Sequence, residues 1–518
     1  MVPETSTLET FRKKLIELFP KRKDAIMNLL DAITANAHQA RSIVQLSETP
    51  QFERQYSSIT DAIADGLPHA KWQEIERLIY QSVTQNDEKK VNRFLLDCTG
   101  NPRPFARTLE DRTITHAPNP APGNKPIVVG HQYSTLALLP DDAPSKSKHW
   151  IVPLSIQRVH SDEKGNEAGI KQVIQYIKDN ALSTQLNIVA ADSLYSSNNC
   201  RALASTEGSI VGIVRLNSTR NIYFFPEASA SKRGRKKEYG ERMKLNDPST
   251  HKPCNEQTQT LWMHRKGHEY TVHIECWKDM LIRGSRDFQA AKHPFTLIRI
   301  TIKNQQGKTV FKNPLWLAVT GKQRNNVSLI DAYNDYRSRY DIEHFFRFGK
   351  QKLLMRTYQT ADVIHEELWW KLCALAYNQL HLGRNQVTTT LHRWEVYLPQ
   401  YKGIDQKQPS LLTPSQTQRG FAKLLNRIGT PAAKCVARGR GAGRKAGDLQ
   451  EKRAKQTVIF KTNKASKTAD QPILLRSEET PRDSDPERIE IFLKSVLKTL
   501  GQINISPSEF TKRLLNPG

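Results

Sequence analysis

Four side chains within fifteen residues have the types and spacing needed to handle a phosphate group and a metal ion. They are an aromatic hydroxyl, a guanidinium, a carboxylate and an ammonium: Tyr336, Arg339, Glu343 and Lys350. Apolar periodicity predicts a helix from about residue 327 to 354, on which these positions share one face about 60° wide. Glu343 could hold a metal ion while the other three side chains contact phosphates. The alternative is a solvated helix face with an Arg339–Glu343 ion pair.

Two more carboxylates follow short apolar runs that are typical of strands. Asp97 ends the run Phe94-Leu95-Leu96, and Asp192 ends the run from Ile188 to Ala191. An open α/β sheet presents side chains at strand ends to a crevice, although a single strand-end Asp is more often a loop cap. Together with Glu343 they could form a cluster of the hard oxygen ligands that Mg²⁺ or Mn²⁺ prefers. A pair of such ions clamps the oxygens of an in-line displacement at phosphorus, so the predicted chemistry is phosphodiester cleavage.

The elements needed to position these groups predict an α/β domain with a mixed sheet. Strand-like runs at residues 94–97, 126–130, 150–154 and 188–192 are joined by a helical pattern around residues 170–177. Several β-rich fragments between residues 201 and 314 predict an inserted β subdomain. A last strand at 315–319 precedes the helix of Glu343, and another long helical pattern covers residues 364–382.

On these residues the chain resembles the DDE transposases of bacterial insertion sequences. One branch of that family is marked by Tyr, two residues, Arg, three residues, Glu, six residues and Lys, which is the spacing from Tyr336 to Lys350. The segments around Asp97 and Asp192 are also similar to the family's, as are residues 214–217 and 232–240. The resemblance covers about residues 91–385 and is weak outside them.

The resemblance implies an RNase H-like core that is interrupted between the second Asp and the Glu by a largely β insertion. It implies that the catalytic residues and ligands of two Mg²⁺ or Mn²⁺ ions are Asp97, Asp192 and Glu343. It also implies that Tyr336, Arg339 and Lys350 contact transposon-end DNA, and that two element ends are paired by a homodimer on DNA. Three nearby acidic residues are alternatives to Asp97 for the first carboxylate, namely Asp111, Asp141 and Asp142.

The expected fold class is α/β, an RNase H-like mixed sheet core with an inserted β-rich subdomain and helical N- and C-terminal regions. Residues 1–90 are expected to form a helical N-terminal DNA-binding region, and residues 91–200 the first part of the core. The β-rich insertion spans residues 201–314, and residues 315–390 form the second part of the core with the catalytic helix. Residues 391–518 are expected to be a basic linker and a C-terminal helical region, with an amphipathic helix at about residues 486–500.

The charge balance favours a polyanionic partner. The 518 residues include 78 Lys or Arg and 52 Asp or Glu, for a net charge of +26. In the basic run 232–244, the DNA-binding candidates Arg233, Arg235 and Lys236 could enter a narrow minor groove, or the run could be a solvated loop that only neutralises phosphates. A second basic stretch at residues 434–467 is expected to be a flexible linker. The expected partners are terminal inverted repeats and target DNA.

The cysteines and the hydropathy pattern exclude several other classes. Six scattered cysteines without a Cys-x-x-Cys pair indicate free thiols in a reducing compartment. A zinc site built from residues 254, 264, 268, 273 and 276 is an alternative, but two of them sit in a strand-like run and no compact pair of ligand steps precedes them. Neither a signal peptide nor a run of about 18 apolar residues is present, so a cytoplasmic, nucleoid-associated protein without membrane contact is expected.

The sequence therefore predicts a transposase that binds terminal inverted repeats, hydrolyses the phosphodiester bond at each end and joins the freed 3′-hydroxyl to target DNA. Such an enzyme only needs to position water or a hydroxyl in line and neutralise developing charge, so no covalent enzyme intermediate is required. The alternatives are a host nuclease or junction resolvase on the same core, and an inactive DNA-binding relic. The complete carboxylate set and the intact helix signature favour activity over the relic.

Overall fold

A computed structural model describes most of the chain up to residue 459. The described residues are 7–37, 40–84, 91–116, 126–140, 150–226, 237–263, 268–284, 288–389, 392–397, 412–436, 447, 449 and 455–459. All of them belong to one compact unit, Met1–Phe460. The candidate DNA contacts Arg233, Arg235 and Lys236 lie outside the described residues, as do the predicted helix at 486–500, Asp141, Asp142 and most of the basic stretch 434–467.

The centre of the fold is a mixed sheet in the order β4-β3-β1-β5-β6. β1 (Val91–Pro102) pairs antiparallel with β3 (Ile127–Leu138), which pairs antiparallel with β4 (Val152–Val159) and β2 (Thr113–His116). On its other side β1 runs parallel to β5 (Leu186–Ala191), and β5 runs parallel to β6 (Ile210–Arg215). The parallel strands are buried on both faces, which explains why they read as continuous apolar runs. Their carboxyl ends meet at one edge of the sheet.

The sheet continues beyond β6 through the β-rich segment. β12 (Leu315–Thr320) pairs antiparallel with β6 and with β11 (Phe295–Asn304), and β11 pairs with β10 (Glu269–Ile282). The strands β7 (Asn221–Tyr223), β8 (Arg242–Lys244) and β9 (Glu256–Met263) complete a 12-stranded sheet. The predicted α/β class with a mixed sheet is confirmed. The insertion predicted at residues 201–314 includes β6, which the structure pairs with β5 inside the central sheet.

Helices connect and cover the central strands. α6 (Gly165–Asp179) links β4 to β5 and packs on β1, β3 and β4 through a stripe that includes Ile170, Val173 and Ile177. The turn η3 (Ser193–Ser196) and α7 (Asn198–Ala204) link β5 to β6. Further short helical turns occur at η4 (Pro248–Thr250), η5 (Ala290–Lys292), η6 (Arg324–Asn326) and η7 (Glu395–Tyr397).

The single helix predicted from about residue 327 to 354 is two helices, so that prediction was wrong in detail. α8 (Leu329–Ser338) and α9 (Tyr340–Lys352) meet at Arg339, whose φ of −52° and ψ of −34° remain helical. The buried side chains of α8, such as Tyr333, belong to a core beneath β10, β11 and β12. Those of α9, such as Phe345, belong to the main core. The helices divide where the segment passes from one hydrophobic core to the other.

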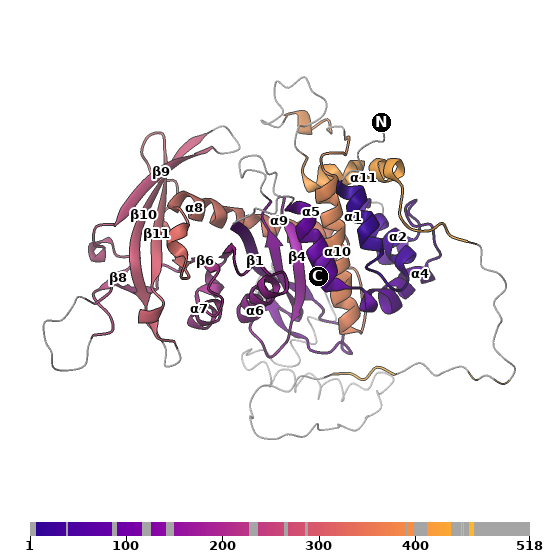
Figure 1. Cartoon of the computed structure of the whole chain (residues 1–518), viewed down its shortest axis with the longest axis horizontal. Coiled ribbons are helices and arrows are strands. Elements are labelled where there is room, and N and C mark those ends of the chain that lie inside the picture. Colours follow the sequence, from indigo (N-terminus) through magenta and orange to yellow (C-terminus); the bar gives the residue numbers. More distant parts are fainter. Residues whose placement is uncertain are drawn as a thin grey trace, which may run out of the picture. The chain divides into compact units, whose positions relative to one another are not determined.

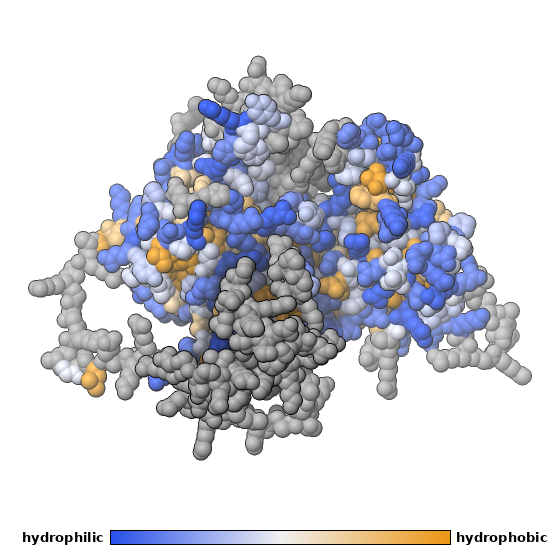
Figure 2. All heavy atoms as spheres, turned by 180° about the vertical axis from the view of Figure 1, so that it is seen from behind, coloured by the Kyte–Doolittle hydropathy of each residue, from blue (hydrophilic) through white to orange (hydrophobic). Residues whose placement is uncertain are grey.

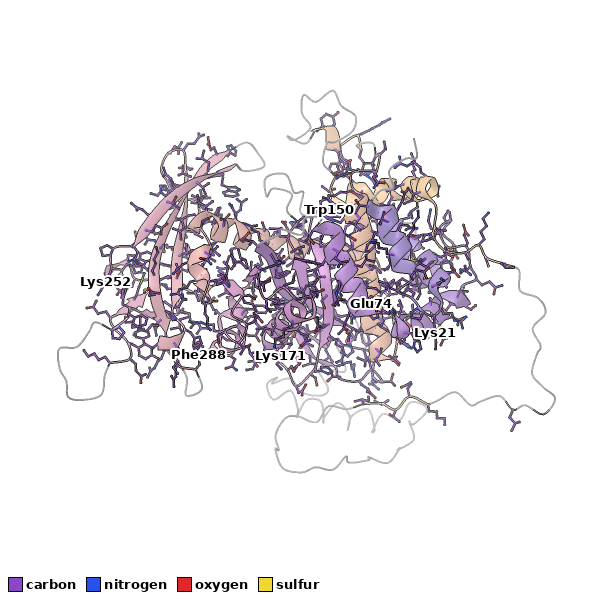
Figure 3. The ribbon with its side chains drawn as sticks, in the orientation of Figure 1. Lys21, Glu74, Trp150, Lys171, Lys252 and Phe288 are labelled. Carbon is purple, nitrogen blue, oxygen red and sulfur yellow. The ribbon has the colours of Figure 1, made fainter. Side chains whose placement is uncertain are left out.

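The N-terminal helices pack against the long helix α10 (Val363–Gly383), as Figure 1 shows for α1 and α2. A buried ion pair joins Arg12 to Asp31, and Arg12 Nη1 also donates to Gln379 of α10 at 2.6 Å. Trp150, which is labelled in Figure 3, packs its ring on Tyr377 of the same helix. The remaining helices are α1 (Thr7–Ile16), α2 (Lys23–Thr34), α3 (Ile43–Leu46), α4 (Ser57–Asp61), η1 (Ala62–Gly66), η2 (Leu67–His69), α5 (Trp72–Val83) and α11 (Pro414–Ile428).

The surface is dominated by polar side chains. Hydrophilic residues cover most of the described surface visible in Figure 2, with apolar residues in small separate groups. Among the helices of the described residues, none is long and apolar enough to cross a membrane. The six cysteines are free thiols, as predicted.

Candidate active site

Two of the predicted carboxylates lie side by side at the carboxyl edge of the parallel strands. The parallel pairing of β1 with β5 ends at the pair Leu96–Ala191, and Asp97 and Asp192 are the residues that directly follow this pair. Asp97 lies inside β1 rather than at its end, because β1 continues to Pro102 along β3. Asp192 caps the turn η3, where its Oδ1 accepts a hydrogen bond from Leu194 N at 2.9 Å.

Arg339 connects the third carboxylate to this edge. Its Nη1 lies 3.5 Å from Asp97 Oδ2, and its Nη2 lies 3.2 Å from Glu343 Oε1 in the first turn of α9. The Arg339–Glu343 pair expected of a simple helix face is therefore present, but the same guanidinium also reaches β1. The Nε of Arg339 is buried and has no hydrogen-bond partner within the described ranges.

The carboxylates act on one another electrostatically. Burial, with smaller contributions from the negative charges of Asp192 and Glu343, raises the pKa of Asp97 to about 6 against the opposing effect of Arg339. Like charges held this close disfavour ionisation of each other, so a cation among them would be stabilised.

The donor set fits a hard divalent cation chemically, because all three candidate ligands are carboxylates. Within the described parts of the chain, however, no three acidic, His or Cys side chains are arranged to hold one ion together. Arg339 supplies the positive charge between Asp97 and Glu343. Ligation of one ion by both carboxylates would therefore replace their contacts with Arg339. The zinc alternative gains no support from the described residues either, and His264 lies outside them.

The other two residues of the helix signature are Tyr336, before Arg339 in the sequence, and Lys350, after it. The Tyr336 ring lies 5.8 Å from the Arg339 guanidinium carbon, and burial raises its pKa. Among the described residues, Lys350 forms no ion pair with a carboxylate. Its Nζ donates to Thr99 Oγ1 at 2.5 Å and to the carbonyl of Gly100 at 3.2 Å, so it contacts β1 just beyond Asp97.

Lys350 is half-buried and lies near two aromatic rings. Its Nζ lies 5.6 Å from the Phe346 ring and 5.9 Å from the Trp370 ring. Burial, with a smaller contribution from the charge of Arg356, lowers the pKa of Lys350 to about 7 against the opposing effect of Asp97. The residue at 100 must be small, because a Cβ on Gly100 would lie 2.2 Å from Thr115 Oγ1. An ammonium in this setting would gain from an anionic contact.

The structure also distinguishes Asp97 from Asp111, the alternative first carboxylate that lies within the described residues. Asp111 forms an ion pair with Arg158, and its Oδ1 accepts a hydrogen bond from Ser161 N at 3.1 Å. These contacts hold the pKa of Asp111 below its usual value, although burial opposes them. Of the two, Asp97 is the one that shares Arg339 with Glu343.

One buried network beside the site was not predicted. Glu366 of α10 is only 1% exposed, and Asn101, His131 and Tyr133 donate to its Oε1 at 2.8–3.0 Å. Arg103 donates to its Oε2 at 2.5 Å. The network fixes the end of β1 to α10. Glu366 is one of several polar residues within the helical pattern at residues 364–382, so no signal in the sequence distinguished it.

The fold and the site define a nuclease-like α/β enzyme, and a comparison with known families agrees. The family model described as DDE superfamily endonuclease matches residues 14–275, just over half of the chain. The protein belongs to this family of DNA-cleaving enzymes, which generally use divalent metal ions. The matched segment contains Asp97 and Asp192 and begins in the N-terminal helices, whereas Glu343 lies beyond it. No curated protein matches the chain.

Proposed function

We propose that the protein is the transposase of a bacterial insertion sequence. It binds the terminal inverted repeats of its element, cleaves a phosphodiester bond at each end and joins the 3′-hydroxyl to target DNA. The observation that carries the proposal is the contact of Arg339 with both Asp97 and Glu343, since it brings the helix signature to the carboxylate of β1. The strand order β4-β3-β1-β5-β6, which is typical of an RNase H-like core, supports it.

In this proposal Asp97, Asp192 and Glu343 are the catalytic residues and metal ligands. Bound Mg²⁺ or Mn²⁺, with two ions expected, would supply Lewis-acid stabilisation of the charge that develops on the phosphate oxygens. Arg339 orients Asp97 and Glu343 before DNA binds and then contacts a phosphate. The carboxylates and the bound DNA hold the attacking oxygen in line with the scissile bond, which lowers the entropic part of the barrier.

DNA contacts beyond the scissile bond come from the basic parts of the chain. Tyr336 and Lys350 hold phosphates next to the cleavage point, and Arg233, Arg235 and Lys236 also bind the duplex. The helices within residues 1–90 bind the element end, and two copies of the chain pair the two ends. The excess of positive charge, +26 in total, supports extended contact with a polyanion.

The proposal is tested with duplexes that carry the inverted repeats flanking the coding sequence. Purified protein with Mg²⁺ should cleave them at the repeat boundary and join the released 3′-hydroxyl ends to a supercoiled plasmid. A duplex of the same length with scrambled repeats is the control. Equal cleavage of both, or preferential cleavage of branched DNA, would identify a host nuclease or resolvase. Repeat binding without cleavage would identify an inactive relic.

A further inference from the structure

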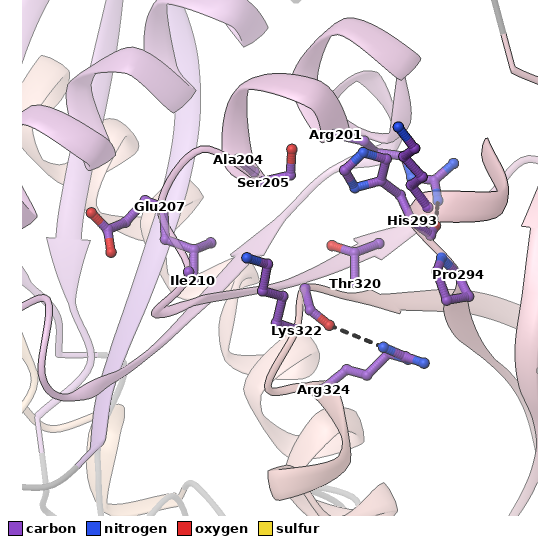
Figure 4. Close-up of a pocket in the computed structure, with 13 residues that line it drawn as sticks. Arg201, Ala204, Ser205, Glu207, Ile210, His293, Pro294, Thr320, Lys322 and Arg324 are labelled. Carbon is purple, nitrogen blue, oxygen red and sulfur yellow. Dashed lines mark hydrogen bonds between the residues drawn. The ribbon is translucent and has the colours of Figure 1, made fainter. Parts of the chain in front are cut away.

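A small cationic cavity lies at the edge of the sheet opposite the candidate active site. It has a volume of about 90 Å³ and is bounded by the end of α7, the start of β6 and the end of β12 (Figure 4). The length of β6 separates its first residue, Ile210, from the carboxyl edge by about 17 Å. A single water needs about 10–15 Å³, so the cavity has room for a larger group.

Arg201 of α7 lines the cavity and is buried without a counter-charge. Its side chain is 7% exposed, and its guanidinium carbon lies 5.1 Å from the Phe288 ring and 5.2 Å from the Phe295 ring. Nη2 donates to the carbonyl of His293 at 2.7 Å, but Nε and Nη1 have no hydrogen-bond partner in the described residues. No carboxylate in the described residues pairs with it. A buried cation of this kind is unfavourable unless an anion accompanies it.

The rim of the cavity adds more positive charge. Lys292 and Lys322 are exposed and form no ion pair within the described residues, and Arg324 pairs with Asp279. Burial lowers the pKa of His293, and the charges of Arg201, Lys292 and Lys322 lower it further, so these cations lie within electrostatic range of one ring.

The one carboxylate of the lining does not neutralise this charge. Glu207 accepts hydrogen bonds from Ser209 Oγ at 2.9 Å and from Ser183 Oγ at 3.3 Å, and Figure 4 shows it turned away from the cations. The cavity therefore has an uncompensated positive charge that comes from a buried guanidinium below and two ammonium groups at the rim.

We propose that this cavity binds a single phosphate group. A compact multivalent oxyanion satisfies the charges of Arg201, Lys292 and Lys322 at once, and phosphate is a common partner of both guanidinium and ammonium groups. The phosphate belongs either to the DNA backbone or to a small phosphorylated molecule. The proposal is independent of the transposase assignment, because it rests on a different edge of the sheet.

The test uses inorganic phosphate as the probe and the full-length protein. At constant ionic strength, phosphate should raise the Tm of the wild type in a saturable manner relative to chloride. Lys322→Ala and Lys292→Ala should each weaken phosphate affinity, measured by calorimetry, about tenfold or more. Arg201→Met should abolish binding. Lys312→Ala is the matched control. This exposed lysine precedes β12 in the sequence and does not line the cavity, which lies at the end of β12.

Two results would overturn the proposal. One is the same Tm in phosphate and in chloride for the wild type. The other is wild-type phosphate affinity in both rim-lysine variants, which remain informative if Arg201→Met does not fold. A duplex of random sequence distinguishes the source of the phosphate. If DNA supplies it, Lys322→Ala reduces the salt slope of duplex binding by about one. If a small molecule supplies it, Lys322→Ala leaves duplex binding unchanged while phosphate binding is weakened.

Discussion

Arg339 lies 3.5 Å from Asp97, a residue 242 positions earlier in the chain. The contact joins the junction of α8 and α9 to the central strand β1, and the same guanidinium holds Glu343. Two segments that are far apart in sequence thus form one site. The expected effect of each substitution below follows from this arrangement or from the contacts that support it.

Removing the charge of either proposed ligand should stop cleavage. Glu343→Gln and Asp192→Asn keep the shape of each side chain but lose a metal-binding oxygen, so we expect no Mg²⁺-dependent cleavage and nearly unchanged binding to repeat DNA. The control Glu275→Gln breaks a comparable pair between Glu275 of β10 and Arg299 of β11 and should keep cleavage. Near-normal cleavage by Glu343→Gln would contradict the assignment.

The raised pKa of Asp97 predicts a pH-dependent effect on stability. The folded pKa is about 6 against an ordinary value of 3.8, so ionisation costs folding free energy as pH rises through this range. Above pH 6 the cost reaches about 3 kcal/mol. Without metal, Asp97→Asn should therefore stabilise the protein at pH 7.5 and have little effect at pH 4, as measured by urea unfolding.

Asp111→Asn serves as the control of opposite sign. The pKa of Asp111 is lowered, so its stabilising contribution is present above the unfolded pKa and is lost as pH falls. This variant should lose stability at pH 7.5 and less at pH 4. Equal effects of Asp97→Asn at both pH values would show that its ionisation is not coupled to folding.

Lys350→Met should lower the cleavage rate more than the affinity for a long repeat duplex. If Lys350 contacts one phosphate beside the scissile bond, its loss removes a charge-assisted contact of about 1.5–3 kcal/mol, whereas many other contacts hold the duplex. Cleavage rate and duplex affinity are measured in parallel. Lys171→Met, an exposed lysine of α6 paired with Glu163, should change either by less than about 0.5 kcal/mol. Equal, small changes in cleavage rate and duplex affinity for Lys350→Met would show that Lys350 takes no part in cleavage.

Arg12→Met should destabilise the N-terminal helices strongly. It leaves Asp31 buried without its partner, and breaking such a pair costs about 3–5 kcal/mol. The double variant Arg12→Met/Asp31→Leu should recover much of the loss, because no buried charge remains. Guanidinium unfolding measures both. A double variant as unstable as the single one would mean that packing, rather than charge, causes the loss.

DNA binding should weaken steeply with salt. Each neutralised phosphate releases counterions and contributes about −0.9 to the slope of log affinity against log salt concentration. Fluorescence anisotropy of a labelled repeat duplex measures this slope. A salt range of about 50–200 mM is suitable, because protein–DNA affinity typically falls steeply over it. A flat response would show that the net charge of +26 serves another purpose.

The local parts of the site were predictable because they depend on local patterns. Apolar runs located β1 and β5, and the spacing from Tyr336 to Lys350 located the helical segment. That Asp97 and Asp192 are neighbours depends on the register of β1 with β5, which no local pattern specifies. The break at Arg339 depends on which core each half of the segment packs against.

The contacts that join distant segments could not be predicted in the same way. Lys350 was expected near a phosphate, but its bond to Thr99 requires α9 to lie against β1. The buried acceptor Glu366 has donors on β1 and β3 that are more than 230 residues earlier. Arg201 meets Phe295 only because α7 lies near the start of β11. Each contact is a product of tertiary packing, since its partners share no sequence periodicity.

The division at Arg339 joins two hydrophobic cores that share strands. Tyr336 packs against the core of α8, whereas α9 belongs to the main core, and β5 and β6 contribute side chains to both. Because the strands are shared, the two cores cannot rotate past each other as separate bodies. Tyr336 and Glu343 are therefore both anchored to the strand that precedes Asp192, so the site is preorganised before DNA binds.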